Sequence, residues 1–169
     1  MPAEISIVQA RLADGALLAR LHATCFAKSW NEEAMATFIA GPGTLCLIGL
    51  ADGARRTPAG FLIARCAADE AELLTIGVVP ACRRRGLARA LLERAVAVLR
   101  ESAVTHLFLE VDRGNTAALA LHHALGAAPA GQRPGYYEDG ADAAIFSLAL
   151  SDSRSDDGPS ADEPRQDQR

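Results

Sequence analysis

The sequence lacks the features of several large protein classes. It has no run of about 18 consecutive apolar residues and therefore no predicted transmembrane helix. Its N-terminal stretch carries acidic residues early and no long apolar segment, so we expect no signal peptide. Neither a Cys-x-x-Cys pair nor a Cys/His ligand spacing occurs, which argues against zinc and against a redox motif.

Cysteine and positive charge are limited too. The four cysteines lie in or beside apolar runs, which predicts reduced thiols and a cytoplasmic protein; they are Cys25, Cys46, Cys66 and Cys82. The formal net charge is −4, of which residues 151–169 carry −3 (six acids and three arginines) and residues 1–150 carry −1. Because general nucleic-acid binding requires a broad positive surface, we expect neither a nucleic-acid nor a membrane partner.

The chain divides by composition into two parts. Residues 151–169 contain one alanine and no larger apolar side chain, so they cannot bury enough surface to offset the entropy of ordering. We predict a disordered acidic and polar tail at 151–169 that follows a single domain at 1–150.

The hydrophobic periodicity of residues 1–150 predicts an α/β (α+β) domain. Asp14 and Asn31 are candidate N-caps for the first two helices. Expected strands cover 4–8, 44–51, 59–66, 70–79, 104–112, 129–137 and 143–150, and expected helices cover 14–26, 32–40, 86–101 and 115–125. The order β-α-α-β-β-β-α-β-α-β-β predicts a mixed, mostly antiparallel sheet of about seven strands with helices on both faces and a parallel fourth and fifth strand.

The most informative segment is an apolar strand that runs through an arginine-rich loop into a long helix. The loop contains Arg83, Arg84 and Arg85, and Gly86 opens the helix. A helix N-terminus offers unpaired N–H groups and a positive dipole end, and a glycine lets an anion approach the backbone. The segment therefore predicts a site for a phosphorylated ligand; a solvated basic turn is the alternative interpretation.

Three blocks of the sequence resemble one enzyme family. Arg83-x-x-Gly86-x-Ala88 fits the Q/R-x-x-G-x-G/A pattern of the GNAT superfamily of acyl-CoA N-acetyltransferases. The blocks at 107–126 and 133–145 are similar to bacterial ribosomal-protein-alanine N-acetyltransferases. The resemblance covers about residues 4–150 and implies the GNAT fold.

The resemblance implies acetyl-CoA as co-substrate and no metal. The coenzyme's pyrophosphate would lie on main-chain N–H groups of the loop, namely those of Arg83, Arg84, Arg85, Gly86, Leu87 and Ala88. Its pantetheine arm would pair with the strand edge at Ile76, Gly77 and Val78 through the main chain, and Asn115 would cap its helix and contact the same arm. Gly77 suits a bulge that separates the fourth strand from the fifth; a packing glycine is the alternative.

Two residues take the family's proton-transfer positions. Glu110 stands where the family has its proposed general base, in an otherwise apolar run; an ordinary ion pair at a strand end is the alternative. His122 stands where the family has a tyrosine that protonates the departing thiolate. Imidazole can replace that tyrosine, or His122 is a surface histidine and Tyr136 or Tyr137 does the work.

The remaining candidates concern the acceptor. Trp30, Tyr136 and Tyr137 are expected to line its groove, with simple packing as the alternative. An α-amino group has a pKa of about 7.7–8.0 against about 10.4 for lysine, so it is more often uncharged at neutral pH. The resemblance implies direct transfer, in a ternary complex, to a protein N-terminal amine, that of a ribosomal-protein alanine. Lysine or small-molecule acetylation and a silent acyl-CoA-binding module are the alternatives.

Overall fold

The structure, a computed structural model, describes residues 4–136, 140 and 142–150. The predicted tail at 151–169 and Tyr137 lie outside the described residues. The strands are β1 (Ser6–Gln9), β2 (Thr44–Ala51), β3 (Thr57–Ala67), β4 (Glu70–Val78), β5 (His106–Asp112), β6 (Ala128–Arg133) and β7 (Ala143–Ala149). The helices are α1 (Gly15–Cys25), α2 (Glu32–Ala40), α3 (Leu87–Glu101) and α4 (Thr116–Ala124). None of these helices is long and apolar enough to cross a bilayer.

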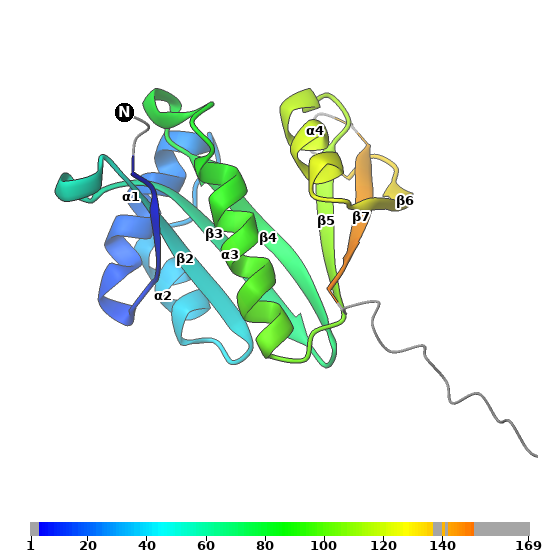
Figure 1. The fold of residues 1–169 in the computed structure, drawn as a ribbon, viewed down its shortest axis with the longest axis horizontal. Coiled ribbons are helices and arrows are strands. Elements are labelled where there is room, and N and C mark those ends of the chain that lie inside the picture. Colours follow the sequence, from blue (N-terminus) through cyan, green and yellow to red (C-terminus); the bar gives the residue numbers. More distant parts are fainter. Residues whose placement is uncertain (1–3, 137–139, 141, 151–169) are drawn as a thin grey trace, which may run out of the picture.

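The strands form one sheet in the order β1-β2-β3-β4-β5-β7-β6 (Figure 1). β4 and β5 run parallel, because α3 connects them as a crossover, and the other neighbouring pairs are antiparallel. This arrangement confirms the mixed, mostly antiparallel sheet and the element order that the sequence predicts.

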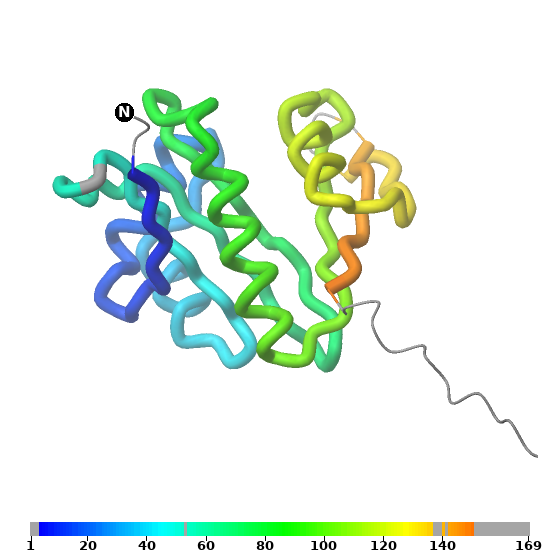
Figure 2. The backbone as a smooth tube through the Cα atoms, viewed as in Figure 1, coloured from blue at the N-terminus to red at the C-terminus, as the bar shows by residue number. Residues whose placement is uncertain are grey.

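Helices cover both faces of the sheet. One core lies beneath α3, whose apolar side buries residues at helical spacing, namely Leu87, Leu91, Leu92, Ala95 and Leu99. The other core lies beneath α1 and α2 and includes Leu18, Met35 and Phe61. The chain trace in Figure 2 shows α3 lying along β3 and β4, on the side of the sheet toward the viewer.

β4 and β5 pair over only part of their length. Their register joins Glu70, Ala71 and Glu72 to residues 106–108, and the strands then diverge (Figure 1). Among the described residues, the edge of β4 from Leu73 to Val78 therefore has no strand partner on the β5 side. Main-chain groups along that edge are available to an extended ligand.

The bulge expected at Gly77 is elsewhere. Gly77 pairs in register with Phe61, and the register shift between β3 and β4 lies three residues earlier, around Leu74. Gly77 is a packing glycine, since a Cβ there would lie 2.6 Å from the ring of Phe61 and 3.0 Å from Cys25 Sγ. The prediction of a bulge at Gly77 was wrong. A glycine is needed at this position because the ring of Phe61 approaches the main chain closely.

Candidate active site

The arginine-rich loop has the geometry of an anion cradle. Arg84 and Gly86 both have left-handed backbone angles, with φ of +63° and +84°. Alternation of right- and left-handed residues turns successive N–H groups toward one concave side. In the part of the chain that the structure describes, no side chain caps the N-terminus of α3, so the first-turn N–H groups, including those of Leu87 and Ala88, have no capping acceptor. The loop therefore offers those donors to an anion.

Arg83 serves the loop differently from its two neighbours. Its Nε donates to the carbonyl of Val78 over 3.0 Å, which ties the loop to the end of β4. It also hydrogen-bonds the Cys25 thiol; this contact opposes the effect of burial, which raises the pKa of that thiol. Arg84 and Arg85 are exposed and provide the charge that an anion would meet.

Only some of the expected main-chain donors and acceptors of β4 point toward the open edge, where β4 and β5 diverge. Val79 N–H donates to Ala59 on β3, and successive residues of a strand point their polar groups to opposite edges. Val78 and Ile76 therefore face the open edge, whereas Gly77 faces β3. Because Arg83 occupies the Val78 carbonyl, the main chain of Ile76 and the N–H of Val78 are the groups left for a ligand.

Asn115 is the N-cap of α4, as the sequence predicts. Its side-chain oxygen accepts a hydrogen bond of 3.1 Å from the Ala118 N–H. The amide NH2 group stays available for a second contact.

Glu110 lies on β5, two residues beyond the last pair with β4, and its side chain is 12% exposed. Its Oε1 lies 3.1 Å from Nη1 of Arg133. A hydrogen bond between Glu110 and Tyr136 raises the pKa of that tyrosine, whose ring lies 5.4 Å from the Arg133 guanidinium. Glu110 therefore forms an ion pair at the site, and Arg133 is a functional candidate that the sequence singled out only within a family block.

A groove of about 430 Å³ runs past Glu110 on this face of the sheet. Its wall contains a second ion pair, in which Arg65 Nη2 lies 3.4 Å from Glu72 Oε2. Its lining residues are Arg65, Ala67, Glu70, Ala71, Glu72, Phe108, Glu110, Ala130, Arg133 and Ile145.

His122 is buried, so the interpretation as a surface histidine is wrong; the neighbouring His123 is exposed. Its ring packs 6.5 Å from that of Phe146, and its buried Nδ1 has no hydrogen-bond partner among the described residues. Burial lowers the pKa of His122. Because Ile145 is opposite Glu110 in the sheet and Phe146 is the next residue, His122 and Glu110 lie on opposite faces.

The structure brings Tyr136 to Glu110 but places Trp30 in the core beneath α1 and α2. Trp30 stacks on His22 with ring centroids 4.8 Å apart, and also on Phe38. The main-chain N–H of Trp30 donates to Nδ1 of His22 over 3.2 Å. Packing therefore accounts for Trp30, which is not among the residues that line the groove at Glu110. Tyr136 is 50% exposed.

The two buried histidines predict sensitivity to acid. Burial lowers the pKa of His22 and His122 below the ordinary value near 6.5, which both regain in the unfolded chain. Their contribution to stability is therefore present above about pH 6.5 and is lost as the pH falls below it. We expect the urea midpoint to fall between about pH 7.5 and 5.5. His22→Gln should reduce this difference, and an unchanged difference would contradict the assignment.

Comparison with known proteins identifies the family. Residues 16–127 match the acetyltransferase (GNAT) family. The chain belongs to this family. The resemblance and the GNAT fold that the sequence predicts are therefore confirmed. Solved structures with this fold hold acetyl-CoA, which is a phosphorylated ligand.

Two of the relatives carry the same name. The chain is 44% identical to the [ribosomal protein bS18]-alanine N-acetyltransferase of Escherichia coli K12 over 96 residues, which are 55% of this chain and 65% of that enzyme's length. It is 38% identical to the Salmonella typhimurium protein of the same name over 125 residues, 72% of this chain and 82% of the other. The crystal structure of the Escherichia coli ribosomal-protein-S18-alanine N-acetyltransferase superimposes with a TM-score of 0.80 at 33% identity, covering 90% of this chain and 98% of that one.

Proposed function

We propose that the protein transfers the acetyl group of acetyl-CoA to a protein N-terminal amine, that of an alanine of a small-subunit ribosomal protein. One observation carries the proposal: the divergence of β4 and β5 has an anion cradle at the end of β4 and Glu110 on β5. The names of the relatives support the acceptor. The proposal places the enzyme in the cytoplasm and includes neither a metal, a nucleic acid nor a membrane.

The residues divide the chemistry as follows. Acetyl-CoA supplies an activated acetyl group on sulfur. The loop at 83–88 binds its diphosphate, and the free edge of β4 and the Asn115 amide align its pantetheine arm. Glu110 accepts the proton that the amine loses, directly or through water, as the C–N bond forms and the C–S bond breaks. Tyr136 holds the acceptor beside Glu110, with Tyr137 as a further proposed contact.

We also propose that His122 assists the departing sulfur. A buried imidazole with a lowered pKa is neutral near pH 7, so it stabilises a thiolate by donating an N–H rather than by giving up a proton. His122→Phe removes this donor and is expected to lower kcat on the order of tenfold, whereas His122→Tyr, which restores the family's residue, should retain activity. Stopped-time assays at saturating acetyl-CoA measure both. Equal turnover in His122→Phe and wild type would exclude the role.

Mass spectrometry of peptides incubated with acetyl-CoA tests the proposed function. Peptides that begin with alanine should gain an acetyl group at the N-terminus, and N-terminally blocked peptides with an internal lysine should not. Transfer to lysine or to small amines instead would favour a different acceptor. Binding of acetyl-CoA without transfer to any amine would favour a silent binding module.

A further inference from the structure

We infer that Arg133 is a positioning residue, which holds the Glu110 carboxylate in the orientation that accepts a proton. The inference rests on the proposed function, because it assigns Glu110 as the base. It concerns a residue of β6 that does not itself meet the reacting atoms.

The ion pair joins strands that are not neighbours. β7 lies between β5 and β6 in the sheet, so the Arg133 side chain crosses β7 to reach Glu110. The residue of β7 directly opposite Arg133 is Ala143, which is fully buried, and the residue opposite Glu110 is Ile145. A small side chain at 143 leaves room for the arginine to lie across the strand.

Stability alone does not explain this contact. The Arg133 side chain is 53% exposed, and exposed ion pairs contribute little to stability. Fixing a long arginine side chain in one geometry also costs rotamer entropy. The contact instead provides a partner for the charge of Glu110. This side chain is only 12% exposed on an apolar strand, where burying it without a partner would be costly.

One guanidinium organises two groups at once. Arg133 binds Oε1 of Glu110, and its guanidinium also lies against the ring of Tyr136, which hydrogen-bonds the same carboxylate. Glu72, the other carboxylate that acts on Tyr136, is paired with Arg65. Arg133 therefore fixes the rotamer of the base and the position of the tyrosine together.

Kinetics of Arg133→Met and Arg133→Lys, each alone and combined with Glu110→Gln, test the inference. Arg133→Met should lower kcat about 10- to 50-fold with little change in KM for acetyl-CoA, since a charge-assisted contact to the base is lost. Arg133→Lys should recover part of the loss, because lysine keeps the charge but not the fork. In the Glu110→Gln background Arg133→Met should add little, because the group it positions is gone.

Arg100→Met is the matched control for a purely structural tether. Arg100 Nε donates to the Leu150 carbonyl over 2.9 Å and ties α3 to the residue after β7, so its loss should lower Tm and leave kcat unchanged. The inference is overturned if Arg133→Met lowers Tm and leaves kcat unchanged, as this control does. It is also overturned if the fold-losses of kcat in Arg133→Met and Glu110→Gln multiply in the double variant. A wild-type protein that acetylates no amine would instead overturn the proposed function, and with it the base that Arg133 would position.

Discussion

Glu110→Gln is expected to lower kcat for acetyl transfer by about 10²- to 10⁴-fold, the range that a positioned general base contributes. Glutamine keeps the size of the side chain and can still accept a hydrogen bond from Arg133, but it cannot take the amine's proton. Binding of acetyl-CoA, measured by calorimetry, should stay within about twofold, because the cradle at 83–88 does not involve this residue.

Glu93→Gln provides the control for loss of one carboxylate. Glu93 lies on the exposed side of α3, where its Oε1 is 2.7 Å from Nε of Arg89, so this variant should behave like wild type. Both variants should unfold within a few degrees of wild type, since neither creates a cavity. Wild-type turnover in a folded Glu110→Gln protein would show that Glu110 is not the base, either directly or through a water molecule.

Gly77→Ala is expected to destabilise the fold by about 1–3 kcal/mol, which is roughly 3–10 °C in Tm for a domain of this size. The new Cβ would lie 2.6 Å from the fully buried ring of Phe61, so the ring or the strand must move. Movement of the strand shifts the main chain of Ile76 and Val78, on either side of the new side chain. We therefore also expect weaker binding of acetyl-CoA, which thermal unfolding and calorimetry can measure separately.

A double variant separates the clash from other effects of alanine. Phe61→Leu alone creates space and should also destabilise the protein. Combined with Gly77→Ala, it should cost less than the sum of the two single variants, because the methyl group enters the space that the ring left. Strictly additive losses would show that Phe61 is not what makes glycine necessary at position 77.

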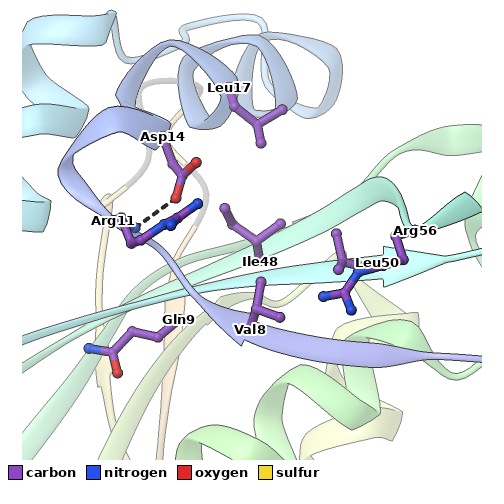
Figure 3. A pocket seen from close by; sticks show the side chains of 8 residues that line it. All are labelled: Val8, Gln9, Arg11, Asp14, Leu17, Ile48, Leu50 and Arg56. Carbon is purple, nitrogen blue, oxygen red and sulfur yellow. Dashed lines mark hydrogen bonds between the residues drawn. The ribbon is translucent and has the colours of Figure 1, made fainter.

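Local patterns in the sequence predicted most of the fold. The bounds of α2 and β2 agree with prediction, because Asn31 caps α2 through a 2.9 Å bond from Ala34 N–H and the apolar run of β2 is bounded by turn residues. Asp14 failed as a helix cap, since its carboxylate accepts from the Arg11 N–H, three residues earlier. Both groups lie beside the hollow in Figure 3, between β1 and the start of α1.

For the candidate site, the sequence allowed predictions only from local main-chain patterns and from positions that match the family. The Asn115 cap follows from the local pattern and is observed, whereas the proposed roles of the loop at 83–88 and of Glu110 rest on motif and family position. The contact of Arg133 with Glu110 could not be predicted, because it depends on the placement of β7 between β5 and β6. The burial of His122 and the packing of Trp30 likewise arise from tertiary contacts, with Phe146 and with His22 respectively, that no local pattern encodes.

The opposite faces on which His122 and Glu110 lie have a consequence for how each residue can be altered. His122 packs against Phe146 on one face of the sheet, whereas Glu110 lines the groove on the other. A substitution at His122 can therefore change the packing around Phe146 without touching the ion pair of Glu110 with Arg133.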